Sequence, residues 1–235
     1  MSTQKTISPA LVKAYRNAHY FVHDGEEVLL LKVGSIHHAL GHLLKARGQP
    51  TAAFLTAHNP YSQIQTPEQN ASAHQKLLDT LAKAGINVIE GLGSDPNEDW
   101  GPEVSVLALG LTLAQAEQLA DLFGQNAFVW IANHEGFVNL KLRYPIGDSS
   151  EEELAQWISQ LPESLRDAAR GLSGQVRNWL MTVNEFEQHH WLSPSTWDWN
   201  TPWPLARPDG CPISLGTEMD RMFKLTSYGL EKFYP

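Results

Sequence analysis

The pattern of apolar positions divides residues 9–142 into short helices and short strands. Apolar residues three or four positions apart are typical of an amphipathic helix, whereas short apolar runs bounded by Gly, Pro, Asn or Asp are typical of strands. The predicted helices cover residues 9–18, 35–46, 66–84 and 112–123. The predicted strands cover residues 20–22, 28–31, 52–57, 86–90, 104–109, 127–131 and 137–142.

The order of these elements predicts the fold class. Residues 51–131 follow the order β-α-β-β-α-β, the split βαβ arrangement, and one hairpin is added at each end. The first hairpin turns at Asp24-Gly25, a pair that favours tight turns. We therefore predict an α+β sandwich with a split β-α-β-β-α-β core and flanking hairpins. A mixed-sheet α/β fold remains the alternative, because the pattern does not give strand direction.

The signals for strands end at Pro145. Ser150 and the three glutamates after it predict a helix N-terminus, and apolar positions from Leu165 to Phe186 predict an amphipathic helix weakened by Gly171 and Gly174. Residues 191–212 concentrate tryptophan and proline, a composition that excludes a long helix or an inner strand. We predict an α+β domain over 1–145 and a mainly helical, Trp- and Pro-rich extension over 146–235.

That extension is expected to pack on the first domain, because few strand signals and two interrupted helices would build only a marginal core. The apolar stripe of residues 165–186 must itself be covered, either by the same chain or by a second copy. The sequence is therefore compatible with a monomer or a homodimer.

Composition and charge exclude several classes of protein. The chain has 235 residues, of which 42% are hydrophobic and 18% charged, a balance typical of a globular protein. The formal charge of −9 disfavours a nucleic-acid binder and an anionic membrane surface, both of which need basic residues. The N-terminus lacks the apolar region of a secretory signal, so we expect a cytoplasmic protein without a membrane partner.

The motifs of common cofactor and metal sites are missing. There is no phosphate-binding P-loop, no HExxH helix and no GxSxG elbow, and Gly91-Leu92-Gly93 is not followed by the helix that a dinucleotide fingerprint requires. His38 and His42 have a metal-ligand spacing but no third ligand is marked, and Cys211 is the only cysteine. The acidic residues from Glu90 to Glu103 are interpreted as a solvated loop. The sequence thus predicts no metal site and identifies no cofactor.

Polar side chains at the ends of predicted strands and helices form the candidate site. Asn59 directly follows a buried strand, and Pro60 favours an extended conformation that projects the Asn59 amide. Glu103 enters a strand, and the other polar residues occupy positions where packing alone does not require them. The candidate ligand-binding residues are Asn59, Asn70, Glu103, Ser105, Gln125 and Asn126. The alternative is a capped turn in which Asn59 and Ser62 bond the local backbone.

Several short motifs in this order resemble a bacterial family of unassigned function, the domain of unknown function 3293. They are residues 15–20, Thr56-Ala57-His58-Asn59-Pro60, Asn70, Trp100-Gly101-Pro102-Glu103-Val104-Ser105 and Phe123-Gly124-Gln125-Asn126-Ala127. The resemblance covers about residues 8–144 and leaves the extension outside. It implies no reaction, cofactor or catalytic residue. His58 departs from the aromatic residue, such as Trp, expected at its position, so the resemblance supports no catalytic role for it.

Two functions of different classes follow from these observations. Asn and Gln amides offer paired donors and acceptors suited to a nucleobase or an amide, which favours a small-molecule or nucleotide-type ligand site. Whether such a site is enzymatic is left open, and no catalytic residue is assigned. The alternative is a non-enzymatic interaction or regulatory module that uses the acidic surface and the tryptophan-rich tail.

Overall fold

The computed structural model describes residues 5–96, 100–132, 136–160, 163–171 and 174–182. The chain divides into two compact units, which we name by their place in the sequence: the central unit is residues 17–144, and the terminal unit joins residues 1–16 to residues 145–235. The predicted packing of the extension on the first domain stays a prediction. Its tryptophan-rich segment, with Cys211, lies outside the described residues.

The central unit alternates strands and helices in the predicted order. Its elements are β1 (His19–Asp24), β2 (Glu27–Leu31), α2 (His38–Ala46), β3 (Thr51–Thr56), the short 3₁₀ helix η1 (Pro60–Ser62), α3 (Pro67–Lys83), β4 (Val88–Ser94), β5 (Glu103–Leu109), α4 (Leu113–Leu122), β6 (Ala127–Ala132) and β7 (Val138–Leu142).

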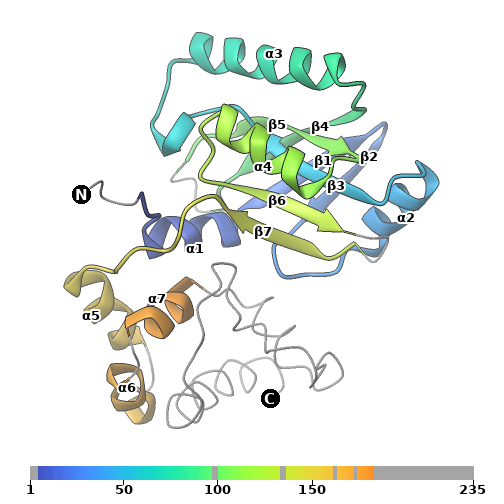
Figure 1. The fold of residues 1–235 in the computed structure, drawn as a ribbon. Helices are drawn as coiled ribbons and strands as arrows, with labels where there is room; N and C mark the ends of the chain where they lie inside the picture. Colours follow the sequence, from blue (N-terminus) through green and yellow to red (C-terminus); the bar gives the residue numbers. More distant parts are fainter. Residues whose placement is uncertain (1–4, 97–99, 133–135, 161–162, 172–173, 183–235) are drawn as a thin grey trace. The chain divides into compact units, whose positions relative to one another are not determined.

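These strands form one seven-stranded sheet in the order β2-β1-β4-β5-β3-β6-β7 (Figure 1). All the pairings of neighbouring strands are antiparallel. The four inner strands, in the order β4-β5-β3-β6, are the split βαβ core, and the hairpins add β1 and β2 at one side and β7 at the other. The structure therefore confirms the predicted α+β class over the mixed-sheet alternative.

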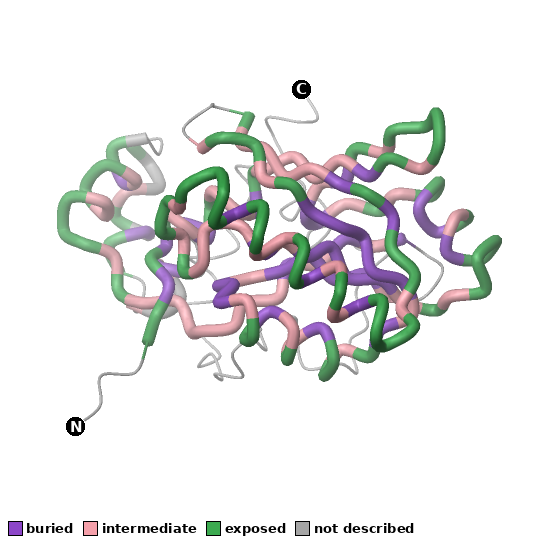
Figure 2. The backbone as a smooth tube through the Cα atoms, turned by 90° about the horizontal axis from the view of Figure 1, so that it is seen from above, coloured by how far each residue is buried: buried purple, intermediate pink, exposed green. Residues whose placement is uncertain are grey.

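Helices α3 and α4 share one apolar core with one face of the sheet. Leu77 and Leu81 of α3 and Ala116 and Ala120 of α4 belong to the same buried cluster as alternate residues of β3, β5 and β6. Strand residues two apart point to the same face, so this cluster defines a two-layer arrangement. Figure 2 shows the result, with buried residues concentrated along the strands and exposed residues on the outer sides of the helices.

Local sequence signals account for the starts of both crossover helices. Thr66 and Gln69 form a capping box at α3, and Thr112 and Gln115 form another at α4. In each box the threonine oxygen accepts from a backbone N–H of the first turn while the glutamine oxygen accepts from the threonine N–H. The predicted boundaries of these helices are therefore close to the observed ones.

Helix α2 begins three residues later than predicted, and tertiary pairing is the reason. Residues 33 and 34 form a turn, and the chain then pairs with the start of β7: the Gly34 N–H donates to the Val138 carbonyl and Ile36 forms a β-bridge with Phe137. Ser35, the predicted first residue of the helix, donates its hydroxyl to the Lys32 carbonyl instead. The ring nitrogen Nδ1 of His37 accepts from the Leu40 N–H and caps the helix.

Strand β4 extends through the glycines that the sequence suggested to be a loop. The segment from Gly91 to Ser94 pairs with β1 on one side and, as far as Gly93, with β5 on the other. A methyl group on Gly91 would lie 2.6 Å from the Phe54 ring and 2.9 Å from the Phe21 carbonyl oxygen. Glycine here allows an aromatic side chain to cross the strand, and its role is packing and not phosphate binding.

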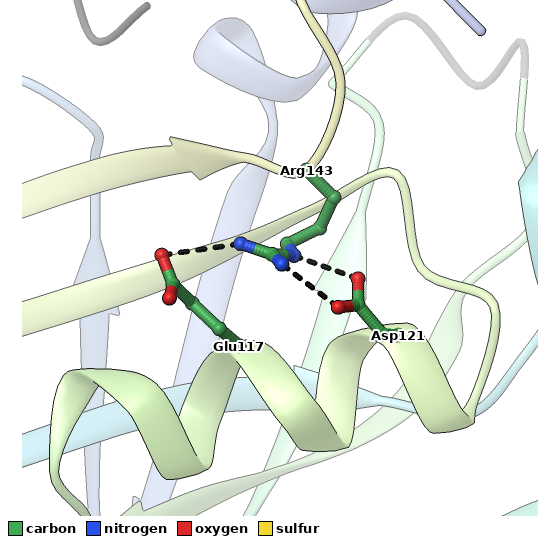
Figure 3. A network of polar contacts seen from close by, with 3 residues as sticks. All are labelled: Glu117, Asp121 and Arg143. Atoms are coloured by element: carbon green, nitrogen blue, oxygen red, sulfur yellow. Dashed lines mark hydrogen bonds and ion pairs between the residues drawn. The ribbon is translucent and has the colours of Figure 1, made fainter.

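An arginine at the end of β7 fastens the C-terminal half of α4. The Arg143 guanidinium donates to both carboxylate oxygens of Asp121 at 2.8 Å and lies 3.1 Å from a carboxylate oxygen of Glu117 (Figure 3). These hydrogen bonds lower the pKa of Asp121 and raise that of Arg143. The Arg143 backbone N–H also donates to the Asn126 carbonyl. Arg143 therefore holds α4 and the start of β6 in a defined register.

The terminal unit contains α1 (Pro9–Asn17, of which residues 9–16 belong to this unit), α5 (Glu151–Gln160), α6 (Glu163–Arg170) and α7 (Gly174–Thr182). Ile7 forms a parallel bridge with Ile146 and is 2% exposed. The buried Asn178 accepts from the Ser149 hydroxyl at 2.7 Å. The predicted stripe of residues 165–186 is divided between α6 and α7, and its last residues lie outside the described part.

No helix in the described ranges is both long enough and apolar enough to span a membrane.

Candidate functional site

The split βαβ topology brings several element ends to one end of the sheet. Strand β3 ends at Thr56, opposite Ser105 near the start of β5, and the register of β3 with β6 places the start of β6 at the same end. Helix α3 begins and helix α4 ends at the same end of the sheet. The polar residues predicted for the site all lie at these ends. The sheet therefore gathers them around the loop of residues 57–65, which we name the Asn59 loop.

The backbone of the Asn59 loop is strained. Asn59, Tyr61 and Ser62 have φ angles of 46°, 58° and 57°, which only a few per cent of non-glycine residues adopt. Each such residue costs about 1 to 3 kcal/mol and persists only where the surroundings impose it. The prediction of an extended Asn59 was wrong: its ψ is 58°, and the conformation is left-handed. Asparagine tolerates this region, and the bonds of Asn59 to its neighbours hold it there.

Asn59 is the centre of a network that joins the loop to α3 and β5. Its backbone N–H donates to Oδ1 of Asn70 at 2.9 Å, and its Oδ1 accepts from Nδ2 of Asn70 at 3.1 Å. Its Nδ2 donates to Oε1 of Glu103 at 2.7 Å. The same Oδ1 accepts from the Gln65 N–H, six residues later. The structure thus joins Asn59, Asn70 and Glu103 directly, and it also contains the local backbone bond that the capped-turn alternative predicts.

Gln125 and Asn126 hold the other side of the same loop. Both are buried, and both follow α4. Nε2 of Gln125 donates to the His58 carbonyl at 3.0 Å, and Nδ2 of Asn126 donates to the Ser62 hydroxyl at 3.0 Å. These two amides bond the loop backbone and its last strained residue, so they position the loop from the end of α4, whereas Asn70 positions it from α3.

Gly124 allows the loop to lie against the end of α4. Its carbonyl accepts from the Tyr61 N–H at 2.6 Å. Its φ is 65°, and a methyl group there would meet Pro60 at 3.0 Å and the Tyr61 ring at 3.1 Å. Because Gly124 has no side chain, Tyr61 can pack against its backbone, and Tyr61 remains 45% exposed.

Ser105 lies beside the network without a direct bond to the loop. It is 1% exposed, and its hydroxyl donates to the carbonyl of Glu103 at 2.9 Å. Thr56, its partner across the strands, donates to the Val104 carbonyl and accepts from the His58 N–H. Ser105 is thus connected to the network only through the backbone carbonyl of Glu103.

Glu103 is the acidic residue of the network, and its surroundings favour the protonated form. Burial raises its pKa, and the hydrogen bond from Asn59 lowers it to a smaller extent. Among the described residues, Asn59 is the only hydrogen-bond donor to this carboxylate and no cation pairs with it. A partly buried carboxyl held by a neutral amide is suited to exchange a proton or to accept a bond from a ligand N–H.

A second pair of polar side chains, which joins the loop to α3, was not predicted. The imidazole rings of His58 and His74 meet edge to face, with centroids 6.2 Å apart and planes at 85°. His74 lies four residues after Asn70, so both point from the same face of α3. That spacing is the signal in the sequence, but it becomes informative only after Asn70 is known to face the loop.

The residues considered for metal binding are not gathered in the described part of the chain. His38 and His42 are exposed on α2. No three His, Cys, Asp or Glu residues within the described ranges are arranged to hold a metal ion. Glu98 and Asp99 of the acidic loop, and His189 and His190, lie outside those ranges.

Comparison with known proteins finds a family match for part of the central unit. No curated protein and no solved structure matches the chain. The C-terminal extension lies outside this family match. That match begins in β3 and ends in β6, so it includes the Asn59 loop, α3, Glu103 and the end of α4. Residues 55–128 match the family described as Protein of unknown function (DUF3293), as the resemblance in the sequence predicted.

Proposed function

We propose that the Asn59 loop and Glu103 form the binding site of a small polar ligand that offers an N–H donor, such as a nucleobase or a carboxamide. The observation that carries the proposal is a strained loop whose first strained residue, Asn59, holds a partly buried carboxyl group. Three non-glycine residues in the left-handed region are a costly way to build a turn, and such strain clusters at ligand sites. Four amide side chains are committed to maintaining it.

Glu103 supplies the chemistry of recognition. Its Oε1 accepts from Asn59, which fixes the orientation of the carboxyl, and Oε2 receives no bond from the described residues. A ligand N–H directed at Oε2 would make a charge-assisted hydrogen bond in a partly desolvated place, where such bonds are strong. Glu103 is also a group that can transfer a proton and that is bonded directly to Asn59, so it is the residue expected to act if the bound molecule reacts.

The substitution Glu103→Gln separates this role from a structural one. Glutamine keeps an oxygen that accepts from Asn59 and removes the buried charge. Because the pKa of Glu103 is raised in the fold, the folded protein binds the proton more tightly than the unfolded chain, and stability falls as the pH rises from the unfolded pKa to the folded pKa. The stability of the glutamine variant does not fall over this pH range, because its side chain does not titrate. It should therefore melt higher than the native protein at pH 7.5 and equally at about pH 4.

The experiment is a thermal-shift screen of the full-length chain against nucleosides, nucleotides, amino acids and amides. A ligand present at 100 times its Kd stabilises the native state by about 2.7 kcal/mol, which gives a measurable rise in melting temperature. The expected result is a hit for the native chain that Glu103→Gln abolishes. Glu27→Gln is the matched control, because Glu27 is exposed on the edge strand β2, and it should retain the shift.

Two results would contradict the proposal. One is a ligand-induced shift that survives Glu103→Gln unchanged. The other is a screen without any hit together with a glutamine variant that melts lower than the native chain, since this would assign the carboxylate a purely structural role.

A further inference from the structure

The imidazole pair of His58 and His74 joins the two elements that the Asn59 network also joins. His58 precedes Asn59 in the loop, and His74 lies one turn beyond Asn70 on α3. The rings meet edge to face with centroids 6.2 Å apart. Any change at this ring contact therefore acts on the loop and on the helix that holds it.

Both rings carry a buried nitrogen without a hydrogen-bond partner. These atoms are Nε2 of His58 and Nδ1 of His74. Buried polar atoms in native proteins are nearly always bonded, and an exception calls for an explanation. Two phenyl rings would make the same edge-to-face contact without leaving polar atoms unsatisfied. The histidine pair is therefore less favourable for stability than two phenyl rings would be. It differs from them mainly in that an imidazole can take up a proton.

The surroundings of the pair disfavour a positive charge on either ring. Burial lowers the pKa of both histidines, and His74 lowers that of His58 further. Among the described residues, Glu90 of β4 acts on the pKa of His74 in the opposite direction, and Glu103 of β5 is bonded to Asn59, the residue after His58. The other groups bonded to the His58 backbone, Thr56 and Gln125, are uncharged.

We propose that the His58–His74 pair is a pH-sensitive latch: it holds the Asn59 loop against α3 while both rings are neutral, and protonation of either ring releases the loop. An imidazolium in this contact faces a second ring in a partly buried place, and moving the loop outward returns the charge to water. The latch concerns the shape of the loop and does not require the ligand proposed above.

The sign of the pH dependence follows from the lowered pKa values. The unfolded chain binds protons at these histidines at a higher pH than the folded chain does, so stability falls as the pH is lowered from neutrality through the ordinary histidine pKa of about 6.5. The fall stops below the folded pKa values. Each proton excluded by the fold changes the unfolding equilibrium constant tenfold per pH unit.

Amide hydrogen exchange of the full-length chain, read by NMR between pH 5 and pH 7.5, tests the latch. The Asn59 N–H is protected by Oδ1 of Asn70, and the Tyr61 N–H by the Gly124 carbonyl. Their protection factors should fall at least tenfold as the ring protons of His58 and His74 titrate. Amides in the core of β3, such as Leu55, should remain protected, because the opening is local.

Variants distinguish the latch from ordinary packing. His58→Phe and His74→Phe keep an aromatic contact that cannot be protonated, and the loop amides should then stay protected at low pH. Glu90→Gln removes the charge that favours protonated His74 and should move the opening to lower pH. His42→Gln, at an exposed position of α2, should leave the native profile unchanged.

The latch is refuted if both histidines titrate at or above pH 6.5, or if they titrate below it while the loop amides keep constant protection. Loss of protection in His58→Phe and His74→Phe with the same pH profile as the native chain would also overturn it. A ligand screen without a hit leaves these measurements unaffected, so the latch and the proposed binding site fail separately.

Discussion

Replacing Asn70 with alanine should destabilise the folded chain by about 2 to 3 kcal/mol. Asn70 is 9% exposed and exchanges two hydrogen bonds with Asn59, one at 2.9 Å and one at 3.1 Å. Each bond contributes about 0.5 to 1.5 kcal/mol net, so the pair accounts for about 1 to 3 kcal/mol. The upper part of that range applies because the Asn59 N–H is left without its acceptor in a strained backbone.

Urea unfolding of the full-length variant at pH 7.5, followed by circular dichroism, measures this change as a lower midpoint at constant slope. For a chain of this size the same loss lowers the melting temperature by about 4 to 12 °C. Asn87→Ala is the control, since Asn87 is an exposed asparagine directly before β4, and its effect should stay within about 0.5 kcal/mol. An Asn70→Ala variant as stable as this control would refute the argument that amide bonds impose the loop conformation.

Three further changes test the packing described above. Gly124→Ala should cost about 1 to 2 kcal/mol more than Gly85→Ala in urea unfolding, because both positions have a positive φ but only at Gly124 does the new methyl group meet the Tyr61 ring; equal losses would contradict this. Gly91→Ala should destabilise the fold by at least about 2 kcal/mol, because the Phe54 ring occupies the space of the new methyl group. Gly93→Ala should cost less than about 1 kcal/mol, because the nearest atom to its new methyl group is 3.8 Å away. A native melting temperature for Gly91→Ala would disprove the predicted clash with Phe54. Cutting the chain after Pro145 should reduce solubility, because Ile7 loses its bridge to Ile146, and a soluble fragment of residues 1–145 with an unchanged melting temperature would show the extension to be detachable.

The elements that depend on local chemistry were predictable. The threonine–glutamine capping boxes of α3 and α4 and the Asp24-Gly25 turn are formed by residues within a few positions of each other, and their observed boundaries are close to those predicted. The late start of α2 and the length of β4 were not predictable, because both depend on pairing with strands distant in the sequence.

The candidate site was likewise predictable only in part. Polar residues at strand and helix ends were recognisable, since a packed core does not require them there. Their partners were not, because the bonds of Asn59 reach residues 11 and 44 positions away. The left-handed Asn59 also contradicts the rule for a residue before proline, and only the surrounding amides explain it. Local rules thus selected the residues of the candidate site, whereas the arrangement of their side chains depends on the fold.

The bridge between Ile7 and Ile146 closes the intervening chain into a ring. The entropy of closing a ring grows only with the logarithm of its length, and each doubling adds about 0.6 kcal/mol. Insertions in the exposed turns of residues 8–145 therefore barely affect the closure, which leaves this stretch free to lengthen during evolution.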